Sequence, residues 1–341
     1  MEEKLILLGL YLKEKGAFKC TRWVEDMEPL ETLLKKYQED PIILKKMALK
    51  EMERAEKGGI KVLFIKDPSF PQELREIPYP PLFLYVKGEI PDAPRLAIVG
   101  SRKPTPYGRE VAERFARRLA EAGVCLVSGL ARGVDTLVHR TCLDKKGKTI
   151  AILGSALDII YPAENRALYE DICASGGAIL SEFPLGTKPR RENFPRRNRL
   201  ISGLSKGVLV IEAGERSGTL ITAKWAQEQG REVLAVPGSI FSEQSRGTHY
   251  LIKEGAIPVT APEEILDYFG LTPADSPQKA PIPLSSEEER VLSLLSPYPV
   301  HFEELLSQTK LSPPLLLQIL TDLELKNLVL SLPGKFYKAL G

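Results

Sequence analysis

The sequence predicts an α/β fold built on a doubly wound, mostly parallel sheet, with a helical domain before the sheet and a winged-helix domain after it. Short apolar segments alternate with helical segments from Arg95 to about Gly270. The chain before this region shows helical spacing of apolar residues without a strand, and the chain after it shows three helical segments and then a hairpin. Alternating strands and helices are typical of a parallel sheet with helices on both faces.

Each predicted strand of the sheet is a short run that is apolar throughout. Such runs indicate strands buried on both faces, because a strand with one wet face would alternate between apolar and polar residues. Between them lie helical segments such as residues 107–123, in which Val111, Phe115 and Leu119 share one face. The expected strands are 96–100, 124–129, 149–154, 178–183, 207–213, 232–238 and 257–259, preceded by two strands at 61–65 and 82–86.

Changes in composition along the chain give the expected domain boundaries. Residues 1–60 form a helical domain of the helix-hairpin or SAM-like kind, and residues 61–270 form the core. The polar, Pro-rich segment 271–284 is expected to be a linker. Residues 285–341 are expected to fold as the winged-helix domain, because a serine cap opens the first helix and prolines occupy the first turn of the third.

Composition limits the classes of protein to which this chain can belong. Its 341 residues carry a net charge of only +2, and a chain of this length is expected to form several domains. The sequence contains no apolar stretch that could span a membrane, and its first residues do not resemble a secretory signal. The four cysteines are scattered and include no CxxC pair, which predicts a reduced, cytoplasmic protein without a metal site.

The segment Gly186–Leu220 is a local basic patch in a nearly neutral chain. Its first part, residues 186–206, gathers seven cations around a single aromatic residue, Phe194. Cations that contact phosphates beside a ring that stacks on a base are what single-stranded nucleic acid binding requires. The alternative is a solvated loop in which the phenylalanine is incidental. The cations are Lys188, Arg190, Arg191, Arg196, Arg197, Arg199 and Lys206.

The expected carboxyl ends of the strands are rich in Gly, Ser and Thr, which favours a ligand that carries phosphate. In an open parallel sheet, ligands bind at these ends, and glycines let the backbone approach them closely. The first strand runs into Gly100, Ser101 and Arg102. A possible phosphate pocket is expected at further strand ends, formed by Ser128, Gly129, Gly133, Glu212, Ser217, Gly218, Thr219 and Gly238.

Candidates for catalysis and for cofactor binding are few. Neither a G-x-G-x-x-G fingerprint nor a P-loop is present, and no cofactor is predicted. His139 is expected to support packing rather than act as a base. Asp135 and Glu212 suit acid–base chemistry, but they suit helix capping or a hydrogen bond to a hydroxyl equally well.

Several spaced motifs together resemble the DprA/Smf family of DNA-processing proteins. They are LAIVGSRKPTPYG, SGLARGVDTLVH, AILGSALDIIYPAEN, the basic segment through SGTLITA, and VPGSIFSEQSRGTHYLIKEGA, and the resemblance covers about residues 62–268. It implies a cytoplasmic bacterial protein with an extended Rossmann fold that binds single-stranded DNA, protects incoming DNA in natural transformation, displaces single-strand-binding protein and loads the recombinase RecA. It also implies a homodimer through the Rossmann core and no established catalytic activity.

The resemblance also suggests which residues contact DNA. By this likeness, Phe194 stacks on a base while the cations and the backbone amides at the strand ends hold phosphates. One departure is His249, where the family commonly has Asn. The implied nucleic-acid-binding set is Gly100, Ser101, Arg102, Arg191, Phe194, Arg196, Arg197 and Asn198, with Arg199, Ser202 and Gly203 expected to line the pocket floor.

Two other functions remain open from the sequence. The first is a nucleotide-processing enzyme of a related Rossmann-like superfamily, with Glu212 near a Gly-Thr turn at Gly218 and Thr219. The turn lacks a second glycine before Gly218, which weakens this match. The second is a duplex-DNA regulator whose core senses a ligand, although the expected recognition helix near 311–329 carries few cations. An interaction role for this C-terminal domain is favoured.

Overall fold

The computed structural model describes residues 2–25, 28–271, 284–296, 298–326 and 328–339. They belong to two compact units, Met1–Pro273 and Ala274–Gly341. The predicted linker lies almost entirely outside the described residues. No helix in the described ranges is long and apolar enough to cross a membrane.

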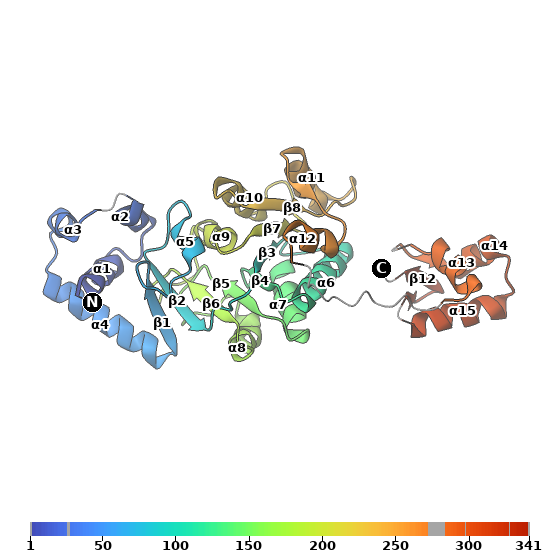
Figure 1. Cartoon of the computed structure of the whole chain (residues 1–341), viewed down its shortest axis with the longest axis horizontal. Helices are drawn as coiled ribbons and strands as arrows, with labels where there is room; N and C mark the ends of the chain where they lie inside the picture. The colour runs from blue at the N-terminus through green and yellow to red at the C-terminus, as the bar shows by residue number, and fades with distance from the viewer. Residues whose placement is uncertain (1, 26–27, 272–283, 297, 327, 340–341) are drawn as a thin grey trace. The chain divides into compact units, whose positions relative to one another are not determined.

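The first unit is built on a nine-stranded sheet with the order β1-β2-β6-β5-β4-β3-β7-β8-β9 (Figure 1). The seven strands from β3 to β9 pair in parallel, and β1 and β2 form an antiparallel edge. The doubly wound, mostly parallel sheet is therefore confirmed. Its strands are β1 (Ile60–Phe64), β2 (Phe83–Gly88), β3 (Arg95–Val99), β4 (Cys125–Ser128), β5 (Thr149–Ile152), β6 (Ala178–Ser181), β7 (Gly207–Val210), β8 (Glu232–Ala235) and β9 (Ile257–Pro258).

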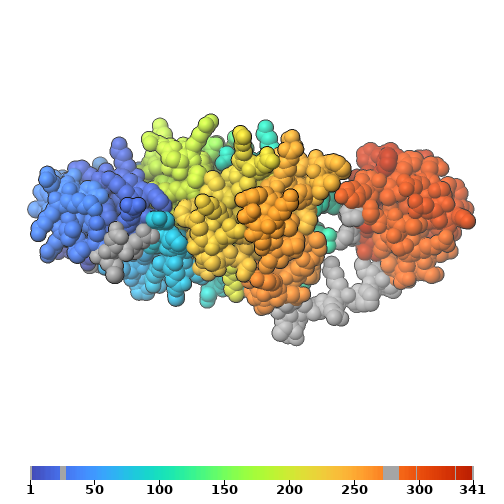
Figure 2. Space-filling model, turned by 90° about the horizontal axis from the view of Figure 1, so that it is seen from above, coloured from blue at the N-terminus to red at the C-terminus, as the bar shows by residue number. Residues whose placement is uncertain are grey.

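Helices cover both faces of the sheet, which explains why its strands are apolar throughout. Ala97 and Val99 of β3 face α9 (Asn193–Gly203), α10 (Thr219–Glu228) and α11 (Arg246–Lys253). Leu96 and Ile98 face the opposite way, toward α6 (Pro106–Glu121), α7 (Val134–Asp144) and α12 (Pro262–Tyr268). Farther along the sheet, α8 (Arg166–Ala174) packs against β5 and β6. Figure 2 views the molecule from the side of α10 and α11, whose atoms are coloured yellow to orange.

The N-terminal helices share a hydrophobic core with the sheet. They are α1 (Glu2–Lys13), α2 (Arg22–Glu25), α3 (Leu30–Tyr37) and α4 (Pro41–Lys57), and α5 (Gln72–Arg75) follows β1. Helices α1 and α4 cross where Gly9 meets Leu44, and a Cβ on Gly9 would lie 2.1 Å from the Leu44 carbonyl oxygen. This glycine therefore permits the close approach of the two helices. Leu8 and Leu10 of α1 join the same core cluster as Val127 and Leu180 of the sheet.

The second unit has the predicted three helices followed by a hairpin. These helices are α13 (Ser286–Leu294), α14 (Phe302–Thr309) and α15 (Pro313–Leu325), and the hairpin consists of β11 (Val329–Leu332) and β12 (Phe336–Ala339). The expected serine cap is Ser285, whose Oγ accepts a hydrogen bond from the Glu288 amide. A two-residue strand that was not predicted, β10 (Val300–His301), adds to the hairpin and completes a winged-helix arrangement.

Candidate nucleic-acid interface

An open groove of about 860 Å³ lies at the carboxyl ends of the parallel strands. The chain runs from β3 toward β6 on one side of this point and from β7 toward β9 on the other. Such a switch in strand order leaves a crevice because the adjoining loops turn toward opposite faces of the sheet. Loops after β3, β4, β5 and β7 line the groove together with α9.

Part of the predicted basic loop is a helix, α9, and this corrects the interpretation of the segment. Pro195 lies in the first turn, where its missing N–H is not needed for a helical hydrogen bond. Because α9 is helical, its residues separate onto two faces. Phe194 and the residues three, four and seven positions after it, Arg197, Asn198 and Ile201, share one face of the helix and line the groove.

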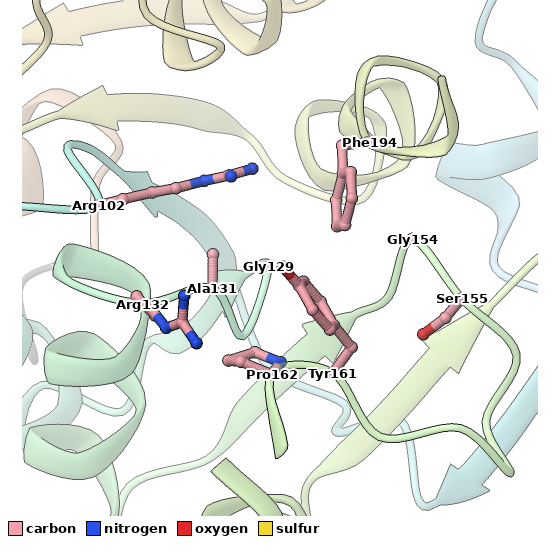
Figure 3. A pocket seen from close by; sticks show the side chains of 9 residues that line it. All are labelled: Arg102, Gly129, Ala131, Arg132, Gly154, Ser155, Tyr161, Pro162 and Phe194. Atoms are coloured by element: carbon pink, nitrogen blue, oxygen red, sulfur yellow. The ribbon is translucent and has the colours of Figure 1, made fainter. Parts of the chain in front are cut away.

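The ring of Phe194 lies close to two guanidinium groups. The Arg102 Cζ is 5.5 Å from the ring centroid, and the Arg197 Cζ is 5.9 Å away. Figure 3 shows Arg102 reaching toward the ring from the loop after β3. Both distances lie within the range of cation–π attraction. The half-buried ring thus forms an aromatic surface beside positive charge, which suits a flat, polyanionic ligand.

Arg197 has a structural role as well as a place in the groove lining. It is 4 % exposed, and its Nη1 donates hydrogen bonds to the carbonyl oxygens of Gly129, at 2.8 Å, and Ile152. Burial lowers the pKa of Arg197 to about 10, so the side chain stays charged at neutral pH. The side chain therefore joins the ends of β4 and β5 to α9.

Asp135 is the acidic residue of the groove lining, and its carboxylate is held by the protein. Its Oδ2 accepts hydrogen bonds from the amides of Gly129, at 3.1 Å, and Ala131, at 3.2 Å. Burial raises the pKa of Asp135, although the nearby Arg197 charge acts in the opposite direction. These contacts fix the β4–α7 loop.

Three exposed arginines in the groove have no acidic partner among the residues that the structure describes: Arg102, Arg191 and Arg216. By contrast, Arg190 lies 4.0 Å from Glu192, and Arg132 pairs with Glu164. Arginines without a counter-charge around a concave surface raise the local concentration of anions. The site therefore presents its positive charge to solvent.

The sequence analysis missed an aromatic residue and a cation of the groove lining. Tyr161 follows β5 and Arg216 follows β7, and both belong to strand-end loops of the resembling motifs. The position of each loop at a strand end was the available signal. The prediction for these loops used their Gly, Ser and Thr residues and left out the larger side chains.

Four residues of the predicted binding set lie away from the groove: Arg196, Arg199, Ser202 and Gly203. This corrects their expected positions. Glu182, which is 1 % exposed, accepts hydrogen bonds from Arg196 Nη2, at 2.7 Å, and from both terminal nitrogens of Arg199, each at 2.7 Å. Burial alone would raise the pKa of Glu182, but the two arginines outweigh it and hold the pKa below its usual value.

The same arginines tie α9 to the N-terminal helices. Arg196 Nη1 donates to the Gly16 carbonyl oxygen, and both guanidinium groups approach the ring of Phe18, at 5.5 and 5.3 Å. The Tyr11 hydroxyl donates to the Glu182 carbonyl oxygen at 2.5 Å. Ser202 bonds within α9, and Gly203 packs against Ile77.

Residues of the expected phosphate pocket divide into two groups. Gly100 and Ser101 line the groove with Ser217, Gly218 and Thr219, and Gly129 lines a smaller pocket that adjoins it. Ser128, Gly133, Glu212 and Gly238 support the loops instead. Glu212 accepts hydrogen bonds from the Thr105 amide, at 2.9 Å, and from the Thr105 hydroxyl. Glu212, the residue that the enzyme hypothesis would use as an acid, therefore bonds to Thr105 and does not line the groove.

Other supporting contacts explain the remaining positions. Ser128 Oγ donates to the Ile98 carbonyl oxygen at 2.7 Å, which joins β4 to β3. Gly133 has a φ of +78°, and a Cβ there would lie 2.4 Å from the Ser101 carbonyl oxygen. The Gly238 carbonyl oxygen lies 3.0 Å from His249 Nε2, so this histidine holds its loop. His139 is fully buried against Thr149, as its predicted packing role requires.

Comparison with known families agrees with the motifs. Residues 61–270 match the model of the DNA recombination-mediator protein A family. The chain belongs to this family. Residues 275–335 match the DprA winged helix domain. The resemblance to DprA/Smf proteins is thereby confirmed.

Two relatives from different bacteria are 51% and 43% identical to this chain over about 200 residues. Protein Smf of Escherichia coli is 51% identical over 205 residues, covering 59% of this chain and 54% of that protein. DNA processing protein DprA of Streptococcus pneumoniae is 43% identical over 207 residues, covering 60% of this chain and 73% of that protein. The matched part of the chain spans about half the length of the first curated relatives.

Two solved structures of family members are similar to this one. The X-ray structure of DNA processing protein A from Streptococcus pneumoniae has a TM-score of 0.59 and 33% identity, covering 78% of this chain and 92% of that one. DNA processing protein A from Helicobacter pylori has a TM-score of 0.56 and 32% identity, covering 62% of this chain and 95% of that one. The latter structure was described for its single-stranded DNA binding mode.

Proposed function

We propose that the groove binds single-stranded DNA. The observation that carries this proposal is the ring of Phe194 within cation–π distance of Arg102 and Arg197, in a groove with cations that lack an acidic partner in the described chain. A ring that keeps one accessible face can stack on any base, and guanidinium groups pair with phosphates. A base in a duplex is stacked and paired, so it does not reach such a ring. The related Helicobacter pylori protein is described as a single-stranded DNA binder, which supports the proposal.

The phosphates of the bound strand would lie along Arg102, Arg191 and Arg216. The amino end of α10, at Gly218 and Thr219, adds the positive end of a helix dipole, which favours an anion. The smaller residues of this lining allow the DNA backbone to approach closely. The strand would therefore cross the groove from α9 to the loop after β7.

Membership of the recombination-mediator family supports a wider role. We propose that the protein protects incoming DNA in natural transformation or recombination, displaces single-strand-binding protein and loads RecA. It would do so in the cytoplasm by binding and handover, without a cofactor and without turnover. A strand-exchange assay with RecA and DNA coated by single-strand-binding protein tests this role: no stimulation by the protein would reject it.

We also propose that the protein is a homodimer through its core. Exposed apolar side chains gather at 240–250, where Ile240 is 77% and Phe241 is 91% exposed, with Tyr250 on the adjoining α11. Such exposed apolar groups favour burial against another chain. Light scattering of wild type and of Phe241→Glu tests the dimer, and an unchanged mass in the variant would place the contact elsewhere.

The winged-helix unit would serve as an interaction module rather than as a reader of duplex DNA. Helix α15 carries no Lys or Arg, and its exposed face includes Leu317, Gln318 and Leu325. A recognition helix in the major groove normally presents several cations or amides to base edges, whereas α15 offers Gln318 alone. Residues 284–341 should accordingly show poor binding to duplex DNA, and tight binding would contradict this role.

Fluorescence anisotropy of labelled oligo-dT tests the single-stranded DNA site. Phe194→Ala should weaken binding by about 1–3 kcal/mol because it removes one stacking surface. Phe336→Ala is a matched control, since this ring lies in the winged-helix hairpin. With about five phosphates neutralised, log K should fall against log salt with a slope near −3.5. An unchanged affinity in Phe194→Ala would reject the stacking role.

Arg102→Ala is the second variant for this experiment, and we choose it over Arg197→Ala. Arg102 is exposed, whereas Arg197 joins two strands to α9 and its removal would disturb the fold. A loss of binding in Arg102→Ala with unchanged stability would assign that loss to the groove. Binding that is absent in wild type would reject the proposed function.

A further inference from the structure

A second aromatic ring faces Phe194 across the smaller pocket. Tyr161 belongs to the loop after β5, and its ring centroid lies 5.9 Å from that of Phe194, with the planes inclined by 49°. Figure 3 shows the two rings on opposite sides of the pocket, one from α9 and the other from the loop. The pocket has a volume of about 30 Å³, and Arg102, Gly154 and Ser155 contribute to its lining. Two segments far apart in the sequence thus bring their rings together.

The ring of Tyr161 is left open to solvent. It is 41% exposed, and its hydroxyl forms no hydrogen bond with the residues that the structure describes. The ring also lines the large groove, so it stands where the smaller pocket opens. An accessible ring at the mouth of a pocket lined by arginines offers a second stacking surface.

The loop that carries Tyr161 is held from several sides. Ser155 Oγ donates to the Ile159 carbonyl oxygen at 2.9 Å, and the Tyr169 hydroxyl donates to the Leu157 carbonyl oxygen at 2.9 Å. On the other side of Tyr161, the Asn165 amide donates to the Leu130 carbonyl oxygen at 3.0 Å. A fixed loop presents its ring with a small loss of entropy on binding.

We propose that Tyr161 and Phe194 form a two-ring pocket that holds one unpaired nucleobase of the bound strand. This inference rests on the proposed function and extends it to a residue that selects single strands. A base between two rings needs about 6.8 Å, two stacking steps of about 3.4 Å each. The present separation of 5.9 Å is smaller and the planes are inclined by 49°, so the exposed Tyr161 side chain turns toward a parallel orientation and its ring moves outward by roughly 1 Å when the base enters, while the loop backbone stays in place.

This arrangement predicts selectivity of a particular kind. Stacking needs only a flat face, so the pocket accepts any of the four bases. A base that is paired in a duplex is excluded, because it must leave its stack and its partner before it can enter. Arg102 beside the pocket is available for the phosphate of the same nucleotide. Tyr161 therefore contributes to the preference for single strands rather than to sequence preference.

Anisotropy measurements on the full chain with two ligands test the pocket. One ligand is labelled oligo-dT, and the other is an abasic deoxyribose-phosphate chain of equal length. Tyr161→Ala should weaken oligo-dT binding about tenfold and leave binding to the abasic chain within about twofold, because the variant loses a base contact and no phosphate contact. Tyr161→Phe should bind both ligands as wild type does. Tyr298→Ala, at a 75% exposed tyrosine of the second unit, is the control and should change neither.

The outcomes separate this proposal from the one on which it rests. Unchanged oligo-dT binding in Tyr161→Ala, or equal loss on both ligands, overturns the two-ring pocket. If wild type binds and Phe194→Ala weakens binding while Tyr161→Ala does not, only the pocket fails. No binding of oligo-dT by wild type overturns the proposed function itself. The double variant gives a further test, because two rings that hold one base should show non-additive losses.

Discussion

The two faces of α9 hold their arginines in different ways. On the groove face, Arg197 stands beside Phe194, and further arginines from neighbouring loops reach solvent without an acidic partner in the described chain. On the opposite face, Arg196 and Arg199 share the single negative charge of the buried Glu182 and pack against Phe18, beside the N-terminal helices. The arginines of α9 are therefore structural on both faces, whereas the exposed arginines of the neighbouring segments, Arg102, Arg191 and Arg216, leave positive charge at the groove. The position of each arginine relative to buried acceptors decides whether its charge reaches solvent.

The largest expected effect on stability comes from removing the charge of Glu182, which holds Arg196 and Arg199 on the face of α9 opposite the groove. We call this the supporting face. Glu182→Gln leaves two buried guanidinium groups without a counter-charge, which should lower the free energy of unfolding by about 3–5 kcal/mol. Urea denaturation measures this loss. Glu192→Gln is the matched control. Glu192 is exposed and its ion pair with Arg190 is long, at 4.0 Å, so its loss should change stability little. A loss below about 1 kcal/mol in Glu182→Gln would contradict the structural role of the network.

A change of pH should alter the stability of the protein without altering the charge of the arginines in the groove. Burial lowers the pKa of His139 to about 3, whereas an unfolded histidine titrates near 6.5. Above pH 6.5, His139 is neutral in both the folded and the unfolded protein. As the pH falls from 6.5 toward 3, only the unfolded protein takes up this proton, so the folded state loses stability. Between pH 7 and pH 5 this amounts to about 2 kcal/mol. His139→Gln should remove that part of the pH dependence in denaturation measurements, while the guanidinium groups of the groove stay charged throughout.

An unchanged pH profile in His139→Gln would mean that another group carries the dependence. Oligo-dT binding at constant salt provides the complementary measurement. It should vary little over the same interval of pH wherever the protein remains folded. Strong variation would show that a titrating group, rather than arginine, governs the groove.

The smallest expected effect concerns a single phosphate contact. Arg191→Ala should make the slope of log K against log salt less steep by about 0.7 and leave stability unchanged, because Arg191 is exposed and lacks an acidic partner in the described chain. Arg196→Ala, five residues away on the supporting face, should lower stability instead. Equal effects of the two variants on both measurements would remove the distinction between the faces.

The sequence by itself determined the main architecture of the protein. Runs such as LAIVG and GVLVIEA are apolar throughout because each strand lies between two layers of helices, and this property is local enough to recognise without a structure. The Gly- and Ser-rich strand ends, Phe194 and the local excess of cations were visible for the same reason. They indicated the groove and part of its lining.

Only the tertiary structure decided which of the cations reach the groove. Nothing in the basic segment indicates that Glu182, just after β6, forms ion pairs with Arg196 and Arg199. Nor does the spacing show that Tyr161 would face Phe194 from 33 positions away. The helical period of α9 and the crossing of distant segments fix these contacts. Sequence thus supplied the types of charge and ring, whereas packing of the chain determined the direction in which each one points.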